Sequence, residues 1–376
     1  MAEQTLIPVT IPDLRGNEAK YLAECVRDNW VSSAGPFVTE MERRMAALSG
    51  RAHAVATVNG TTAIELALRG MGVGAGDLVA VPDWTFAATA NAVIHAGAVP
   101  LFMDVTAATW TFDPALLLAA RDQYGDRIRA AVPVHALGHP ADMDAILAAC
   151  GGQLPVIEDA AGAIGASYKG RPTGGLGHAA IFSFNGNKTV TAGGGGMVVT
   201  EDENLARTVR HLSTQARLGD EYRHDAAGFN YRMTNLNAAV GLAQLERLDE
   251  MVAAKRAVAT RYDRALTGRD DLMTMPRANW AESGCWIYSV ITASKADARS
   301  LVAALSAKRI EARIFWQSLS AQEPYRAYPR LLTGVSARLS GAVVSLPCSS
   351  HLTAADQDRV IAVLAAWRGA VHDAAA

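Results

Sequence analysis

Short apolar runs alternate with helical stretches along the first two hundred residues of the chain. Strands that alternate with helices predict a mainly parallel sheet that is covered by helices on both faces. The stretches 17–28 and 39–48 are the first of the expected helices, and Met41, Met45 and Leu48 lie on one face of the second. The predicted strands are His53–Val58, Leu78–Pro82, Val99–Asp104, Ile128–Val134, Leu154–Glu158, Ala179–Phe184 and Met197–Thr200.

The pattern changes after residue 245. A long helix is expected over 245–264, and a smaller mixed region follows it. That region contains an expected strand over 285–292 and expected helices over 298–308 and 354–367. The sequence therefore predicts an α/β protein with a large domain, 1–245, that includes an N-terminal arm, and a smaller C-terminal α+β domain, 246–376.

Composition and charge narrow the class of partner. The chain has 376 residues, of which 50% are hydrophobic and 19% charged, and its net charge is −2. That charge argues against a nucleic-acid surface or an anionic membrane as partner. The four cysteines lie far apart without metal-ligand spacing, and no apolar run has the length of a membrane span. We expect a cytoplasmic protein, without a bound metal, whose partners are small molecules and other protein chains.

One polar segment between two apolar runs contains the most informative residue. The segment reads AAIFSFNGNKTVTAGGGGMVVT, from Ala179 to Thr200, and includes Lys188. Burial lowers the pKa of a lysine, and an amine with a lowered pKa is the usual nucleophile toward a carbonyl carbon. Only six of the 35 basic residues are lysine, so Lys188 is not one of many solvating cations. The alternative is an ordinary lysine in a surface turn.

In a parallel sheet, ligands bind beyond the carboxyl ends of the strands. After the first strand, Asn59 and Gly60 make a turn, and Thr61 opens a helix whose free amides would favour a phosphate. The same turn is also common in sites that bind nothing, because threonine often caps helices. Ser183, at the end of a later strand, has a hydroxyl that could reach the same phosphate.

An acidic residue and an aromatic residue follow two other strands. Asp159 ends an apolar run and precedes small residues that would let a flat ring approach. Pyridoxal phosphate needs such a carboxylate, because its ring nitrogen must stay protonated. A helix cap is the alternative role. In VPDWTFAATANAV, an aromatic side chain could stack on a cofactor ring, although an aromatic residue after a strand is more often part of the core.

Together these segments resemble the DegT/StrS family of pyridoxal-phosphate-dependent nucleotide-sugar aminotransferases, through nearly the whole chain. The resemblance implies the aspartate-aminotransferase-like fold type I. It implies that Lys188 of SFNGNK carries the cofactor and that Asp159 of EDAA pairs with the pyridinium nitrogen. It further implies that Phe86 covers the ring, with Trp84 as the alternative. Gly60, Thr61 and Ser183 would bind the phosphate.

The resemblance also implies a homodimer with shared active sites. The segment GFNYRMTNLNAAVGLAQL resembles one that reaches into the neighbouring subunit, where Asn230 would contact the cofactor phosphate. From the sequence alone, this segment is equally consistent with a core helix and its polar cap. At Gly162 the chain departs from the family, because many relatives carry His, Gln or Glu there, near the ring hydroxyl.

Finer segments, including NWVSSAGPFV and GFNYRMTN, resemble the branch that makes 4-amino-4,6-dideoxy sugars for bacillosamine and legionaminic acid. The implied reaction is transfer of an amino group from L-glutamate to a UDP-linked 4-keto-6-deoxy-N-acetylglucosamine, for surface glycans such as lipopolysaccharide. The expected substrate contacts are Trp30, Asn187 and Arg313. The alternatives are an enzyme of the GDP-perosamine or 3-amino-sugar type and a non-catalytic sensor with the same fold.

Overall fold

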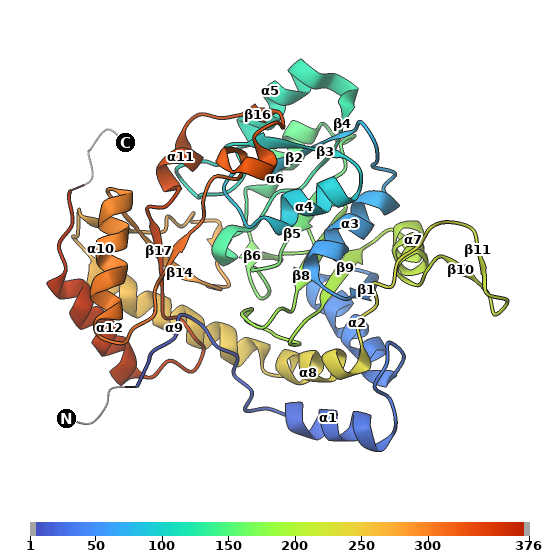
Figure 1. Ribbon diagram of the computed structural model, residues 1–376, viewed down its shortest axis with the longest axis horizontal. Coiled ribbons are helices and arrows are strands. Elements are labelled where there is room, and N and C mark those ends of the chain that lie inside the picture. Colours follow the sequence, from blue (N-terminus) through green and yellow to red (C-terminus); the bar gives the residue numbers. More distant parts are fainter. Residues whose placement is uncertain (1–4, 372–376) are drawn as a thin grey trace.

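A twisted sheet in two four-stranded halves forms the centre of the molecule (Figure 1). The computed structural model describes residues 5–371. In order across the sheet, the first half contains β1 (His53–Thr57), β9 (Gly196–Thr200), β8 (Ala179–Ser183) and β5 (Ile157–Asp159). The second half contains β4 (Ile128–Ala131), β2 (Leu78–Pro82), β3 (Val99–Met103) and β16 (Arg330–Leu331).

Two single bridges, from Ala131 to Val156 and from Val134 to Asp159, connect the halves. Within these eight strands only β9 runs antiparallel to its neighbours. The prediction of a mainly parallel α/β sheet is confirmed.

Helices cover both faces of this sheet because side chains of one strand alternate between the faces. Val55, Val79 and Ile181 face one way and pack with α3 (Gly60–Gly70), α4 (Ala88–His95) and α7 (Glu203–Ser213). Their neighbours Ala54 and Ala180 face the other way, toward α2 (Pro36–Ser49) and α8 (Asn235–Leu245). The helices α5 (Pro114–Tyr124) and α6 (Met143–Cys150) cover that second face beside β2 and β3, and α1 (Glu18–Arg27) lies on α8.

A second, antiparallel sheet lies to the left in Figure 1. Its order is β12 (Leu272–Thr274), β14 (Tyr288–Thr292), β17 (Val343–Leu346) and β15 (Arg313–Phe315). The helices α9 (Leu248–Leu266), α10 (Lys295–Ser306) and α12 (Ala354–Ala366) share its apolar core. The strand β16 returns from this C-terminal part to pair with β3, and the boundary at residue 245 stays a prediction.

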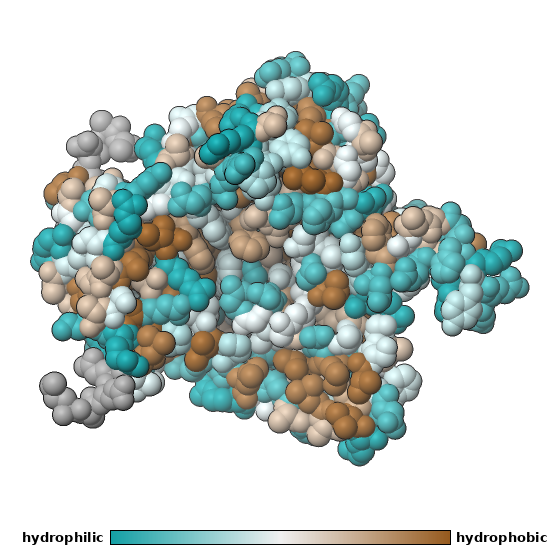
Figure 2. Space-filling model, in the orientation of Figure 1, coloured by the Kyte–Doolittle hydropathy of each residue, from teal (hydrophilic) through white to brown (hydrophobic). Residues whose placement is uncertain are grey.

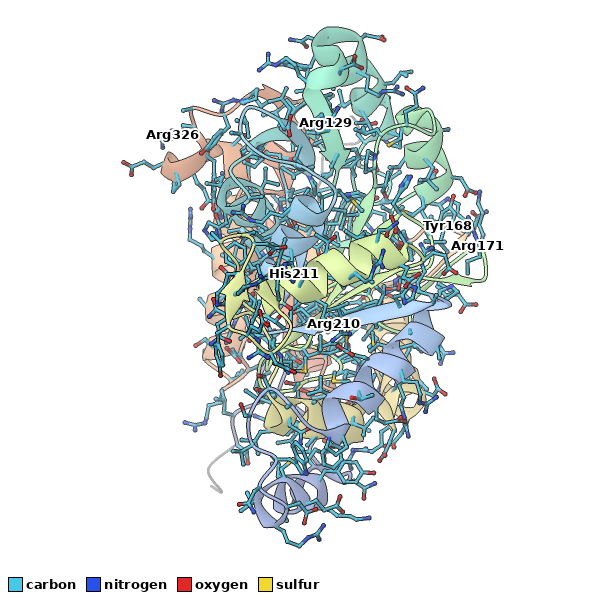
Figure 3. All side chains as sticks on the ribbon, turned by 90° about the vertical axis from the view of Figure 1, so that its right-hand side faces the viewer. Arg129, Tyr168, Arg171, Arg210, His211 and Arg326 are labelled. Atoms are coloured by element: carbon cyan, nitrogen blue, oxygen red, sulfur yellow. The ribbon has the colours of Figure 1, made fainter. Side chains whose placement is uncertain are left out.

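The remaining elements are short. They are the three-stranded sheet of β6 (Ser167–Tyr168), β7 (Arg171–Pro172) and β13 (Ala281–Glu282), the hairpin of β10 (Arg217–Leu218) and β11 (Arg223–His224), and α11 (Val335–Leu339). Figure 3 shows Arg210 and His211 on α7, where Arg210 donates to Glu42 of α2 and His211 contacts Asp225 at the base of the hairpin. Within residues 5–371, no helix combines the length and apolar character needed to cross a membrane.

Candidate active site

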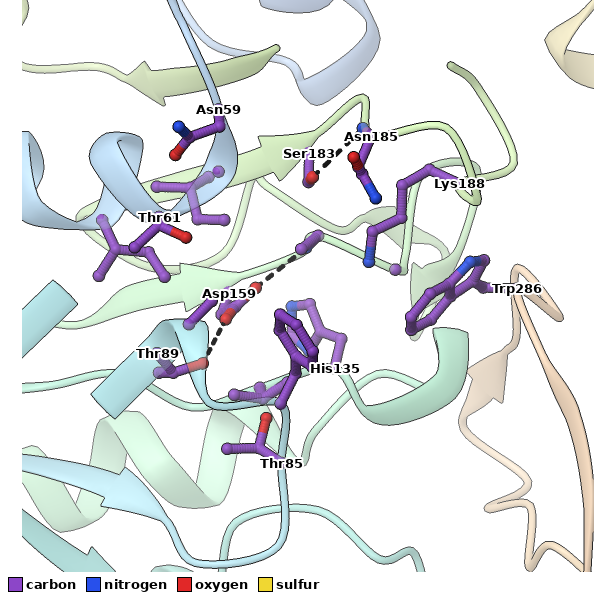
Figure 4. Close-up of a pocket in the computed structure, with 18 of the residues that line it drawn as sticks. Asn59, Thr61, Thr85, Thr89, His135, Asp159, Ser183, Asn185, Lys188 and Trp286 are labelled. Carbon is purple, nitrogen blue, oxygen red and sulfur yellow. Dashed lines mark hydrogen bonds between the residues drawn. The ribbon is translucent and has the colours of Figure 1, made fainter. Parts of the chain in front are cut away.

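A cavity of about 330 Å³ lies where the carboxyl ends of β5 and β8 meet the N-termini of α3 and α4 (Figure 4). This is the edge of the sheet at which the sequence predicts a ligand. Seven of the ten predicted site residues line the cavity: Gly60, Thr61, Phe86, Asp159, Ser183, Asn187 and Lys188. Residues more than a hundred positions apart in the sequence therefore meet in one place.

The amine of Lys188 points into this cavity (Figure 4). Burial lowers the pKa of Lys188 to about 8, and the Asp159 carboxylate opposes that shift because its negative charge favours the ammonium form. Lys188 Nζ lies 3.5 Å from the centre of the Trp286 ring. An appreciable fraction of this amine is thus unprotonated near neutral pH, as a nucleophile or a general base requires.

Asp159 is the last residue of β5, and its carboxylate is fixed by two donors. Thr89 Oγ1 donates to Oδ2 over 2.7 Å, and the Ala161 N–H donates to Oδ1 over 3.1 Å. Only 5% of the Asp159 surface is exposed, so the carboxylate is held in place in a largely dry environment. Thr89 lies in the first turn of α4, and its side chain was not singled out in the sequence.

The other end of the cavity is built by the turn before α3. The Asn59 side chain accepts from the Thr62 N–H and caps the helix, while the first amides of the helix, at Gly60 and Thr61, have no intrahelical acceptor. A Cβ at Gly60 would lie 3.0 Å from the Ser183 Cβ, so glycine lets β8 approach this turn closely. Amides and hydroxyls at a helix N-terminus form an anion site.

The two aromatic candidates are separated by their exposure. Phe86 is 63% exposed and lines the cavity, as expected of a side chain that covers a ring. Trp84 is only 1% exposed and belongs to the core, where it packs edge to face on Trp110 and Trp316 and donates to the Trp316 carbonyl. Trp84 therefore cannot replace Phe86 in the cavity.

The cavity also contains His135, which no sequence motif indicated. Its Nδ1 accepts from the Ala141 N–H, so its proton is on Nε2 and is donated over 2.9 Å to Glu158. Burial would raise the pKa of Glu158, but the hydrogen bond from His135 and those from the amides of Gly174 and Gly177 outweigh burial and lower it. An imidazole whose two ring nitrogens are both hydrogen-bonded thus borders the cavity beside Asp159.

Three predicted site residues do not line the cavity in the single chain. Trp30 is 47% exposed in the loop after α1, and Asn230 is exposed beside Thr214. Arg313 is exposed at the start of β15, where it donates twice to Glu311. Asn187 lines the cavity and its carbonyl accepts from Trp286 Nε1. The roles of these four residues stay predictions.

The residues present fit pyridoxal phosphate. A nucleophilic amine, a fixed carboxylate and a helix N-terminus with a neighbouring serine hydroxyl are the three partners that its aldehyde, ring nitrogen and phosphate require. Within residues 5–371, no group of His, Cys, Asp or Glu side chains could hold a metal ion.

Comparison with known proteins points the same way. The family model described as DegT/DnrJ/EryC1/StrS aminotransferase family matches residues 12–365. GDP-perosamine synthase of Caulobacter vibrioides is 41% identical over 371 residues, which cover 97% of this chain and 99% of that protein. The putative pyridoxal phosphate-dependent aminotransferase EpsN of Bacillus subtilis is 39% identical over 362 residues, covering 94% and 93%. The crystal structure of S. venezuelae DesV superposes with a TM-score of 0.89 at 32% identity, covering 97% and 99%.

Proposed function

The chain belongs to the DegT/DnrJ/EryC1/StrS aminotransferase family, and on that basis we propose that it transfers the amino group of L-glutamate to C4 of a nucleotide-linked 4-keto-6-deoxy sugar. The family consists of pyridoxal-phosphate-dependent sugar aminotransferases of fold type I. The observation that carries the proposal is the placement of Lys188 and Asp159 in one cavity with the helix N-terminus at Gly60. The proposal also includes four finer points: the sugar carbon that is aminated, the nucleotide of the substrate, the amino donor and the oligomeric state.

Each residue then has a distinct task. When bound, pyridoxal phosphate supplies an electron sink that delocalises the carbanion left by removal of a proton. Lys188 Nζ accepts the proton from the α carbon of glutamate, and in the second half of the cycle it delivers a proton to C4 of the sugar. Asp159 holds a proton on the ring nitrogen, and the amides of Gly60 and Thr61 with the Ser183 hydroxyl hold the phosphate. The products are 2-oxoglutarate and the amino sugar.

For the nucleotide, we propose GDP. The support is the Caulobacter vibrioides relative, which is named GDP-perosamine synthase and matches nearly the full length of this chain. A UDP-linked 4-keto-6-deoxy-N-acetylglucosamine is the second candidate, supported by the segments that resemble the bacillosamine and legionaminic acid branch. A role in surface polysaccharide synthesis follows from either substrate.

The test is a parallel assay of the purified protein with pyridoxal phosphate, glutamate and either the GDP-linked or the UDP-linked 4-keto sugar. We expect equal amounts of 2-oxoglutarate and amino sugar, with the GDP-linked substrate turned over at least about tenfold faster. The opposite preference would identify the UDP-linked sugar as the substrate. Turnover of a nucleotide-linked 3-keto sugar, with neither 4-keto sugar converted, would identify the 3-amino type.

The same assay separates an enzyme from a sensor of the same fold. A sensor would bind cofactor or sugar but release no 2-oxoglutarate with either substrate. A matched Lys188→Ala variant sets the background, because it lacks the amine that lines the cavity. Borohydride treatment followed by peptide mapping should place the cofactor on Lys188, and a label on another residue would contradict the site.

A further inference from the structure

The indole of Trp286 borders the reactive amine, although this residue comes from the segment just before β14, in the C-terminal part of the chain. Lys188 Nζ lies 3.5 Å from the centre of its ring, and Figure 4 shows the two side chains facing each other. An ammonium over the face of a tryptophan is attracted by the ring electrons, most strongly where water is excluded. Only 6% of the Trp286 surface is exposed.

Trp286 is fixed from both ends. Its Nε1–H donates over 2.8 Å to the carbonyl of Asn187, the residue before Lys188. Its backbone carbonyl accepts over 3.1 Å from Lys255 Nζ, which also donates to the Cys348 carbonyl. Lys255 is only 3% exposed, and a buried ammonium is costly unless its protons are hydrogen-bonded. The buried lysine thus holds the segment that carries the indole.

The indole also explains why the chain has glycine at position 162. A Cβ at Gly162 would lie 2.5 Å from the Trp286 Cε3 atom, which is closer than real Cβ atoms approach. Any side chain at this position would therefore displace the ring. In this chain, the indole occupies the space into which a larger residue 162 would extend.

We propose that Trp286 is a further residue of the aminotransfer site, whose indole face holds Lys188 Nζ during the part of the cycle in which this amine is not bonded to the cofactor. This inference rests on the proposed function. A free lysine side chain has several rotamers, so a surface that attracts its ammonium keeps the atom beside the reacting carbon. Gly162 is required for this arrangement because it leaves room for the ring.

The variants used in the test leave the other charged and titratable residues around the amine unsubstituted. They are the Asp159 carboxylate across the cavity, His135 on the cavity wall and Lys255 behind the Trp286 carbonyl. Trp286→Leu removes the aromatic face but keeps an apolar filler, and Trp286→Phe keeps a smaller face. Trp280→Leu is the matched control, because that indole packs on Tyr168 and does not line the cavity.

The measurement is the rate at which the cofactor-free protein binds pyridoxal phosphate covalently at Lys188, followed by borohydride trapping and mass spectrometry across pH 6–10. In Trp286→Leu, we expect the midpoint of the pH profile to fall by about one unit, since loss of the ring removes a stabiliser of the ammonium. Trp286→Phe should fall by less, and Trp280→Leu should keep the midpoint of the unmodified protein. An unchanged or raised midpoint in Trp286→Leu would mean that the indole only fills space, and would overturn the proposal.

A second variant approaches the same point without changing Trp286. Gly162→Ala should displace the ring from its present position, weaken its contact with Lys188 Nζ and lower the midpoint in the same direction, and adding it to Trp286→Leu should cause no further fall. If the falls in midpoint of the two single variants add in the double variant, the two substitutions do not act through the same contact between the indole and Lys188. If the unmodified protein does not bind the cofactor at Lys188, the proposed function fails; if it does and the midpoints do not move, only the role of Trp286 fails.

Discussion

At the scale of single residues, the protonation state of Lys188 determines when the site can react. Burial lowers its pKa to about 8, so the nucleophilic, unprotonated fraction rises with pH and reaches half near pH 8. We expect the rate of covalent cofactor attachment to follow this fraction and to be roughly a hundredfold below its plateau at pH 6. Asp159→Asn should move the midpoint below 8, because the Asp159 charge favours the ammonium. A midpoint near 10 would show that Lys188 is hydrated.

Thr89 is a second residue with a testable role, through the carboxylate that it fixes. Thr89→Val keeps the shape of the side chain but removes the hydroxyl that donates over 2.7 Å to Asp159. A hydrogen bond to a charged group contributes about 1.5–3 kcal/mol, so we expect kcat to fall by about 10- to 100-fold. The control is Thr208→Val on the exposed face of α7, where the hydroxyl donates only to a backbone carbonyl. Equal kcat values for the two variants would exclude the anchoring role.

The sequence indicated residues of the cavity that follow a strand, but not those that reach the cavity from elsewhere in the chain. Lys188 was predicted because a single lysine in a polar segment between two apolar runs needs a chemical reason, and Asp159 because it is an acidic residue at the end of an apolar run. His135 directly follows a predicted strand, so the same argument would have indicated it. Trp286 gave no local signal, because its place in the cavity depends on hydrogen bonds with Asn187 and Lys255, which lie far from it in the sequence.

At the scale of elements, apolar runs predicted the positions of strands but not their directions. Buried parallel and antiparallel strands have the same hydrophobic pattern, so the antiparallel direction of β9 was not visible in the sequence. The strand β5 begins at Ile157 rather than at the predicted Leu154, and the intervening Pro155 has no N–H for the ladder. Two-residue strands such as β16 have too few residues for any periodicity.

The turn between β1 and α3 depends on a glycine in another strand. A Cβ on Gly196 of β9 would lie 2.4 Å from the Asn59 carbonyl, so Gly196→Ala should push the turn away from β9. Overpacking of this kind costs about 1–3 kcal/mol, and we expect that loss in urea unfolding together with weaker binding of the cofactor phosphate. Gly194→Ala is the matched control, because a Cβ there has no neighbour within 4 Å. Equal stability of the two variants would contradict the close contact.

At the scale of the whole molecule, an apolar surface around α1 suggests that the chain functions as a dimer. Leu14, Val26, Trp30 and Val31 are between 47% and 66% exposed, and Figure 2 shows hydrophobic atoms gathered at this lower edge. Monomers seldom expose large contiguous apolar patches. We expect a particle of twice 39.7 kDa in light scattering, and dissociation in Val26→Glu. The control is Leu118→Glu on α5, which changes another exposed apolar residue in a different region and should leave the mass of the particle unchanged.

Sharing of the active sites is a separate prediction, and a mixture of two impaired variants tests it. If Asn230 of the partner subunit completes the site around Lys188, then Lys188→Ala and Asn230→Ala homodimers each lack one component in both sites. A mixed dimer would then contain one site with both defects and one intact site. Random reassociation should therefore restore about a quarter of the unmodified activity. If each site were built within a single chain, no site in the mixed dimer would be intact, and mixing would restore nothing.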